Sequence, residues 1–257
     1  MKMNKKQAAM QERLARVEYL LDKNVSFEVQ EAFRNFKASL TVSMPKKTGA
    51  GSVVMITSAC PGDGKTTVTV NLALTFAMSD VKVVLVDADV RKGRVSRYFK
   101  ARSAPGLSDY LSGQATLEQV TRKVAQHDNL SYISCGTHSP RPFELLESEE
   151  MQSLLAELKT KYDYVIVDTP PVMVVSDALA LVPATDGVVL VCRHEMSSVS
   201  DIAKALDKLQ FAKANILGTV INDYNRRART YSRTNNEYQY YANAYMEEVA
   251  AAESENE

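Results

Sequence analysis

One stretch, VVMITSACPGDGKTT at residues 53–67, constrains the fold more than any other part of the chain. An apolar run rich in β-branched residues leads into a turn that contains Gly62 and Gly64, and a helix-forming run begins at Lys65. Glycine lets the backbone adopt left-handed conformations and approach a ligand closely. The N–H groups of such a turn, together with the start of the following helix, bind anions. The order of strand, turn and helix therefore predicts a phosphate-binding loop rather than a glycine-rich turn without a ligand.

Within this loop, Lys65 is expected to reach the β- and γ-phosphates of a nucleotide, and the hydroxyl of Thr66 to ligate Mg²⁺. Ala59 occupies the place of the pattern's first glycine, and its small side chain predicts only a modest effect. The nucleotide-binding residues expected in the loop are Pro61, Gly62, Asp63, Gly64, Lys65, Thr66 and Thr67.

Polar residues end three of the apolar runs. KVVLVD ends at Asp87, which Asp89 follows, and YVIVD ends at Asp168. The carboxyl ends of parallel strands meet at one edge of a sheet, where carboxylates can hold Mg²⁺ and position a nucleophile. An ordinary acidic turn is the other interpretation of Asp87 and Asp89. Asn222 ends the last run, where it could recognise a nucleotide base or serve only a turn.

The chain has 257 residues, enough for one α/β domain with a large core. Apolar strands alternate with helical segments, which predicts an α/β fold with a doubly wound, mostly parallel sheet, that of P-loop NTPases. The expected strands are 53–56, 82–87, 130–134, 164–168, 187–192 and 216–222. The expected helices are 65–77, 106–111, 117–124, 144–161, 176–181 and 200–209. The predicted divisions are 1–50 for N-terminal helices and a linker, 51–223 for the P-loop domain, and 224–257 for a tail.

Two helices are expected in the N-terminal division. Residues 1–24 form a helical pattern with a basic start, suited to docking or oligomer contact rather than to an anionic membrane surface. Residues 26–40 place three apolar side chains on one side and Glu31, Arg34 and Lys37 on another. Because these charged residues recur every three positions, they are neighbours, either at an interface or on a solvated face.

The tail differs in composition from the rest of the chain. It holds half of the 12 tyrosines, namely Tyr224, Tyr231, Tyr238, Tyr240, Tyr241 and Tyr245. Arginines lie between several of these tyrosines, glutamates close the chain, and aliphatic residues are few, so disorder is expected. Interleaved arginine and tyrosine also suit nucleic acid, but the acidic end and a formal net charge of zero argue against such a partner.

The three cysteines, Cys60, Cys135 and Cys192, are too widely spaced for a zinc site or a disulfide pattern. A reduced, cytosolic compartment fits this usage. Cys60 lies inside the phosphate loop, where a tolerated small residue is the preferred interpretation over a redox switch. No apolar stretch is long enough to span a bilayer.

Three motifs together resemble those of a known family. The segments 59–66, 84–92 and 165–171 are similar to Walker A, A′ and B of the bacterial tyrosine kinases (BY-kinases) that serve capsule and exopolysaccharide export. Residues 31–34, 106–113 and 177–222 fit as well, and the tyrosine cluster completes the resemblance.

The resemblance implies an ATP- and Mg²⁺-dependent autokinase that phosphorylates its six tail tyrosines in trans within a ring-like homo-oligomer. Its catalytic residues would be Lys65, Asp87 and Asp89, and its metal ligands Thr66, Asp87 and Asp168. Glu31, Arg34 and Lys37 would form the oligomer interface, although Lys37 replaces an arginine, and the two side chains are not equivalent in bidentate contacts. Gly93 stands where a proline is usual.

The resemblance also implies the split, cytoplasmic type of kinase, which a separate membrane activator of the polysaccharide co-polymerase type recruits to the inner face of the membrane. A phosphotyrosine phosphatase would be a further partner. The alternative function is a partitioning or positioning ATPase similar to ParA and MinD, whose signature lysine is replaced here by Cys60. A non-catalytic scaffold switched by ATP is the third interpretation.

Overall fold

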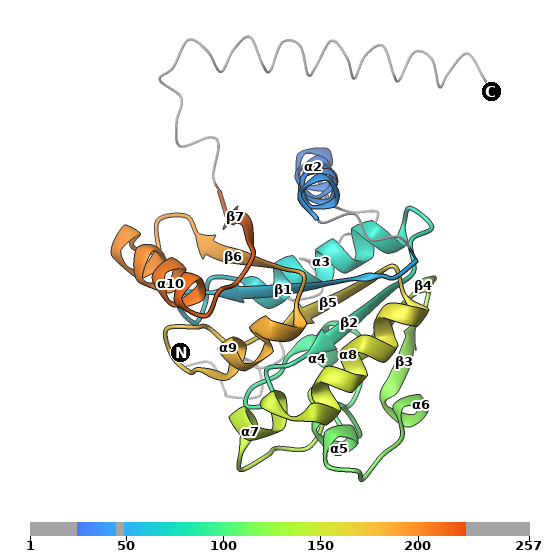
Figure 1. Ribbon diagram of the computed structural model, residues 1–257. Helices are drawn as coiled ribbons and strands as arrows, with labels where there is room; N and C mark the ends of the chain where they lie inside the picture. Colours follow the sequence, from blue (N-terminus) through green and yellow to red (C-terminus); the bar gives the residue numbers. More distant parts are fainter. Residues whose placement is uncertain (1–24, 45–48, 225–257) are drawn as a thin grey trace, which may run out of the picture. The chain divides into compact units, whose positions relative to one another are not determined.

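The computed structural model describes residues 25–44 and 49–224 (Figure 1). The predicted helix at 1–24 lies outside the described residues, and so do the tail from residue 225 onward and all of its tyrosines except Tyr224. In the described part of the chain, no helix combines the length and the apolar character that crossing a membrane requires.

Within residues 25–44 and 49–224, the sheet has seven strands in the order β3-β4-β2-β5-β1-β6-β7. Their bounds are β1 (Ser52–Ser58), β2 (Val83–Asp87), β3 (Thr121–Val124), β4 (His127–Ile133), β5 (Tyr164–Asp168), β6 (Gly187–Arg193) and β7 (Ile216–Asn222). Only β3, at one edge, is antiparallel to its neighbour β4, and the other pairs are parallel. The mostly parallel α/β sheet predicted from the sequence is confirmed.

Helices cover both faces of this sheet (Figure 1). The first group is α2 (Phe27–Ser43), α3 (Lys65–Ala77) and α4 (Val95–Tyr98). The second is α5 (Leu107–Leu111), α6 (Leu117–Val120), α7 (Pro142–Glu147), α8 (Glu149–Lys161), α9 (Asp177–Leu181) and α10 (Val199–Phe211), with a 3₁₀ turn at Val182–Ala184. Each group packs against its own face, which is the doubly wound arrangement.

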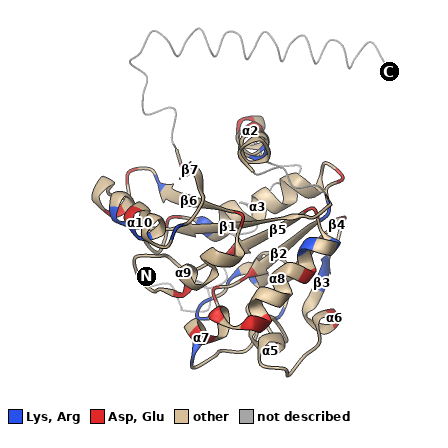
Figure 2. Ribbon diagram, in the orientation of Figure 1, with Lys and Arg blue, Asp and Glu red and all other residues tan. Residues whose placement is uncertain are grey.

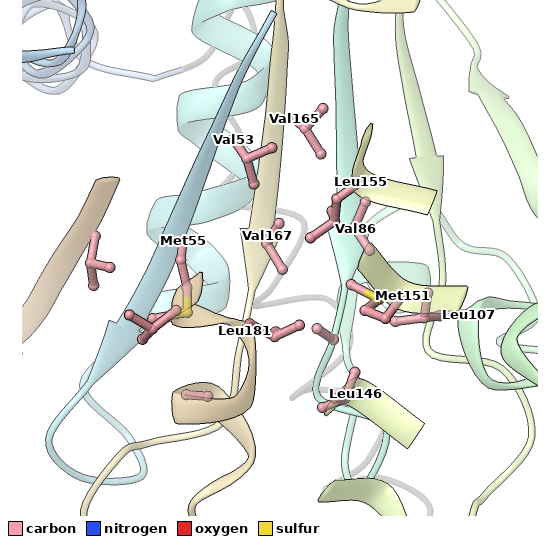
Figure 3. Packing of buried hydrophobic residues seen from close by; sticks show 14 of the residues in the cluster. Val53, Met55, Val86, Leu107, Leu146, Met151, Leu155, Val165, Val167 and Leu181 are labelled. Carbon is pink, nitrogen blue, oxygen red and sulfur yellow. The ribbon is translucent and has the colours of Figure 1, made fainter. Parts of the chain in front are cut away.

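Alternation along the strands divides the core in two. On β1, Val53 and Met55 face the layer of α8 and α9, whereas Val54 and Ile56 face α3, and all four are fully buried. Figure 3 shows the first of these clusters, with Met151 of α8 among the strand side chains. Each such side chain contributes about 1.5–3 kcal/mol through the removal of apolar surface from water.

The predicted helix over 117–124 is wrong in its second half. A capping box between Thr116 and Gln119 starts α6, which ends at Val120, and Thr121–Val124 forms the edge strand β3 instead. The β-branched Thr121 and Val124 suit a strand, and pairing with β4 outweighs the short helical pattern.

The single helix predicted over 144–161 is two helices that meet at Ser148. The Ser148 hydroxyl accepts a hydrogen bond from Met151 N at 3.3 Å and so caps the start of α8. This helix begins with two glutamates and ends with lysines, as Figure 2 shows, which complements its dipole.

The helix α2 packs on α3 through Phe33, Phe36 and Leu40, and Met44 directly after the helix joins the same buried cluster. It extends three residues beyond the predicted end at Leu40. Ser26 at its start makes no side-chain capping hydrogen bond, consistent with the absence of a capping-box glutamate.

Candidate active site

The phosphate loop connects β1 to α3 along residues 59–64. Gly62 and Gly64 have φ angles of +94° and +86°, which other residues adopt only with strain. A Cβ on Gly64 would also lie 1.9 Å from Asn222 Nδ2, so this position has no room for a side chain. Ala59 is fully buried and its φ is not positive, which explains why the loop tolerates alanine here.

The Asp63 side chain organises the loop from within. It is 1% exposed, and its Oδ2 accepts a hydrogen bond from Cys60 N at 2.9 Å, while its Oδ1 accepts one from Ser197 Oγ at 2.9 Å. Asn222 at the end of β7 donates to the Asp63 carbonyl at 3.0 Å. The predicted residues Asp63 and Asn222 therefore both contact the loop, and direct contact of either with a nucleotide stays a prediction.

Four predicted residues converge at the carboxyl edge of the sheet. Asp87 and Asp168 end the neighbouring strands β2 and β5 and are paired in register. Lys65 Nζ lies 3.6 Å from Asp89 Oδ2 and 3.9 Å from Asp168 Oδ2. One lysine thus faces a group of three carboxylates.

Thr66 and Thr67 follow Lys65 at the start of α3. The Thr66 hydroxyl donates to Asp168 Oδ2 at 2.7 Å, which brings two of the predicted metal ligands into contact. The Thr67 hydroxyl lies 2.6 Å from Tyr98 Oη, so in this structure it is hydrogen-bonded to α4.

Burial and mutual repulsion dominate the electrostatics of the carboxylates. Burial raises the pKa of Asp87 well above its ordinary value, the charge of Asp168 raises it further, and the Val95 N–H opposes the change. Burial also raises the pKa of Asp168, against the opposing effects of Lys65 and the Thr66 hydroxyl. Such a concentration of negative charge fits a cation.

Among the described residues, no group of three or more His, Cys, Asp or Glu side chains could hold a metal ion on its own. Mg²⁺ keeps water and substrate phosphates as ligands and needs only one or two carboxylates. The hydroxyl of Thr66 and the carboxylates of Asp87 and Asp168 are hard oxygen donors of the required kind.

Asp177 is a residue of the site that the sequence reasoning missed. Its carboxylate is 1% exposed and accepts two hydrogen bonds from Arg91, Nε–Oδ2 at 2.6 Å and Nη2–Oδ1 at 3.1 Å. This pair ties the A′ loop, residues 88–94, to the first residue of α9. The only sequence signal was an acidic residue at a helix start, which is common.

The three predicted interface residues of α2 make different contacts. Glu31 and Arg34 form an ion pair on the surface. Lys37 instead places its Nζ 5.5 Å from the centroid of the Phe76 ring, a cation–π contact with α3. Lys37 therefore stabilises the packing of α2 on its own domain, whatever contacts the other two make.

Tyr224, with 44% of its surface exposed, is the exposed tyrosine of the described residues. Tyr98 and Tyr132 are buried, whereas Tyr110, Tyr162 and Tyr164 are partly buried. In the described part of the chain, the globular domain thus offers few accessible tyrosine hydroxyls.

Burial raises the pKa of all three cysteine thiols. It raises the pKa of the Cys60 thiol, and the nearby Asp201 and Asp63 raise it further. Burial, together with Asp87 and Asp89, raises the pKa of Cys135 to about 12. A redox switch needs a thiolate, so this geometry favours the interpretation of Cys60 as a tolerated loop residue.

Comparison with known proteins identifies the family. The family described as AAA domain matches residues 51–220. Tyrosine-protein kinase YwqD of Bacillus subtilis is 40% identical over 169 residues, which are 66% of this chain and 71% of YwqD. The chain belongs to the bacterial tyrosine kinases.

Longer relatives contain a similar kinase segment. EpsB of Ralstonia solanacearum is 34% identical over 244 residues, which are 94% of this chain but only 32% of the length of EpsB. The solved kinase domain of Etk from Escherichia coli has 35% sequence identity and a TM-score of 0.74, covering 79% of this chain and 78% of that domain.

The positioning ATPases are more distant. MinD of Pyrococcus horikoshii, solved with Mg-ADP, has 28% identity and a TM-score of 0.59, covering 68% of this chain and 72% of MinD. The alternative function is therefore less well supported than the kinase function, although the shared fold agrees with the predicted P-loop NTPase fold.

Proposed function

We propose that this chain is an ATP-dependent protein-tyrosine autokinase that phosphorylates the tyrosine cluster of its own tail in trans and thereby regulates capsule or exopolysaccharide synthesis and export. The observation that carries the proposal is the convergence of Lys65 and Thr66 with Asp87, Asp89 and Asp168 beside a phosphate loop. Family membership supports the tyrosine acceptor, since relatives named tyrosine kinases share this domain.

In the proposed reaction, an acceptor tyrosine oxygen bonds to the γ-phosphorus of ATP, and the bond from that phosphorus to the bridging oxygen breaks, so ADP leaves. Asp87 orients the tyrosine hydroxyl and accepts its proton. Lys65 pairs with the phosphate oxygens, where developing charge is stabilised by a group already in place. The loop around Gly62 and Gly64 binds the phosphates through backbone N–H groups.

Mg²⁺ would be held by Thr66, Asp87 and Asp168, and when bound it neutralises phosphate charge. Asp89 supports this arrangement by keeping Lys65 in the site at 3.6 Å. Asn222 contacts the loop through Asp63 and is proposed to lie beside the bound nucleotide.

The proposed acceptors are Tyr224, Tyr231, Tyr238, Tyr240, Tyr241 and Tyr245. We expect their segment to reach a neighbouring subunit, because the sequence predicts few packed aliphatic residues there. Each phosphate adds about −1.5 to −2 charges, so several phosphates repel one another and would release the tail from the neighbour's site.

Assembly and location follow from the same proposal. Glu31 and Arg34 contact a neighbouring copy in a ring, with Lys37 fixing the helix that presents them. The kinase works in the cytoplasm at the inner face of the membrane, recruited by a separate membrane activator, and a phosphotyrosine phosphatase reverses its modification. Replacing Glu31 and Arg34 by alanine is expected to shift the kinase to a smaller species in size-exclusion chromatography.

The decisive test is phosphotyrosine on the purified full chain after incubation with Mg-ATP. Lys65→Met is expected to lower the signal at least about 100-fold, because charge stabilisation in the transition state is lost. Lys161→Met is the matched control, since Lys161 is an exposed lysine that pairs with Glu157 on α8. Both variants are compared by thermal melting to exclude unfolding.

A second variant distinguishes the role of the tail tyrosines as acceptors from the role of the ATP-binding site. Changing all six tail tyrosines to phenylalanine is expected to remove most phosphotyrosine while ATP binding persists. If phosphate were instead found mainly on Tyr98, Tyr110 or Tyr132, the assignment of the tail as acceptor would be wrong. Wild-type protein that hydrolyses ATP without forming any phosphotyrosine would favour the positioning ATPase.

A further inference from the structure

A cavity lies beside the A′ loop, apart from the phosphate loop. It has a volume of 550 Å³, and Gly93 and Cys135 form part of its lining, whereas Lys65 and Thr66 do not. A Cβ on Gly93 would lie 2.6 Å from Asp87 Oδ2 and 2.4 Å from the Cβ of Cys135. The cavity wall at Gly93 therefore backs directly onto the carboxylate of the proposed base.

The rim of this cavity is strongly basic. Lys92, Arg94 and Arg97 line it and are exposed, and no carboxylate of the described residues forms an ion pair with any of the three. The neighbouring Arg91 is already paired with Asp177. From residue 91 to residue 103 the sequence has six basic residues and no acidic one, in a chain whose net charge is zero.

Unpaired basic side chains around a solvent-open cavity attract anionic groups, and their long stems adapt to a peptide. Anionic residues are distributed unevenly among the tyrosines of the tail. Glu237 directly precedes Tyr238, and Glu247 and Glu248 follow two and three residues after Tyr245. Tyr231, in contrast, lies between Arg229 and Arg233.

We propose that this basic cavity is the acceptor-peptide site of the kinase and that Lys92, Arg94 and Arg97 select tyrosines flanked by glutamates. The occupant is the tail segment 237–248 of a second copy of the chain, so Tyr238 and Tyr245 are modified in preference to Tyr231. This inference rests on the proposed tyrosine kinase function and adds the substrate preference of the same site.

The test uses the full chain with its six tail tyrosines changed to phenylalanine, so that only added peptide is phosphorylated. One peptide has the sequence of residues 235–250, and the second replaces its three glutamates by glutamine. The kinase is expected to prefer the first peptide by about tenfold in kcat/KM at low salt, because two or three partly exposed ion pairs give an effect of that size. This preference is expected to shrink as salt is raised.

Arg94→Gln combined with Arg97→Gln is expected to bring the ratio between the two peptides close to one. The matched control is Lys100→Gln combined with Arg102→Gln, which removes the same charge from the same segment but from side chains that do not line the cavity. This control is expected to keep the preference. Thermal melting and the KM for ATP confirm that both variants are folded and bind nucleotide.

The outcomes separate the two proposals. Phosphorylation of neither peptide by active-site-intact protein would contradict the kinase function itself. Equal phosphorylation of both peptides would leave that function standing and overturn the acceptor site. Loss of the peptide preference in the Lys100 and Arg102 control would also overturn the proposed acceptor site. So would a protein that binds anionic vesicles through Arg94 and Arg97 but shows no preference between the two peptides.

Discussion

The ion pair between Arg91 and Asp177 provides the most quantitative test of how the active site is held. Asp177 is 1% exposed, whereas the Arg91 side chain is 41% exposed. Removing one partner of a fully buried pair costs about 3–5 kcal/mol, and exposed pairs contribute about 0.2–1 kcal/mol. Arg91→Ala leaves the buried carboxylate without this partner, but the place of the partly exposed Arg91 side chain is open to water, so we expect a loss of stability of about 2 kcal/mol, between these limits.

The reverse substitution should be milder. Asp177→Ala removes the buried charge and frees Arg91 to turn into water, so a cost of about 1 kcal/mol is expected. The double variant should resemble Asp177→Ala alone, because no buried carboxylate then remains. The two single effects are therefore predicted to be non-additive by about 2 kcal/mol.

Urea unfolding of the nucleotide-free chain measures these differences, and thermal melting provides a second measure. For a domain of this size, a loss of 2 kcal/mol lowers the Tm by about 4–8 °C. Lys161→Ala, which breaks the exposed pair with Glu157, is the control and should change stability by less than about 1 kcal/mol. Additive single effects, or an Arg91→Ala variant as stable as the control, would refute the argument that the pair anchors the A′ loop.

Three further predictions concern the site itself. Asp87→Asn should lower kcat by at least about 100-fold while changing the dissociation constant of ATP less than about tenfold, because the carboxylate acts mainly in the transition state. Single-turnover kinetics measures the first effect and calorimetry the second. Gly64→Ala should abolish ATP binding in the same calorimetric assay, since the new Cβ would lie 1.9 Å from Asn222 Nδ2 and the φ of +86° is strained for alanine. Cys135, with its pKa raised to about 12, should resist iodoacetamide in the native chain at pH 8 and react after denaturation, as peptide mass spectrometry would show; rapid native labelling would contradict its burial.

Much of the fold could be predicted because most of its strands are easily recognised in the sequence. Parallel strands covered on both faces, such as Val83–Asp87 and Tyr164–Asp168, consist of continuous apolar runs. Their terminal aspartates mark the sheet edge where the site lies. The errors fell on short features: β3 has only four residues, too few for a periodicity that separates strand from helix, and a single residue, Ser148, separates α7 from α8.

The site could be predicted only where its residues lie within motifs. Lys65, Thr66, Asp87 and Asp168 stand at fixed positions after strands, so sheet topology brings them together. The partner of Arg91 could not be found in this way, because Asp177 is 86 residues away and comes from a different connection. The different environment of Lys37 likewise depends on the position of Phe76 in another helix.

The A′ loop unites these observations in one element. Asp89 of this loop and Asp87, which directly precedes the loop, point inward because Lys65 Nζ lies 3.6 Å from Asp89 Oδ2 and because the Val95 N–H donates to Asp87 at 3.0 Å. Its lysine and arginine residues stay at the surface, where water solvates them and the cavity gives them room. In the proposed mechanism, the same short segment contributes a carboxylate to the active site on its inner side and binds an acidic acceptor peptide on its outer side. A disturbance of the Arg91–Asp177 anchor should consequently reduce catalysis and peptide preference together, whereas loss of Arg94 and Arg97 should affect the preference first.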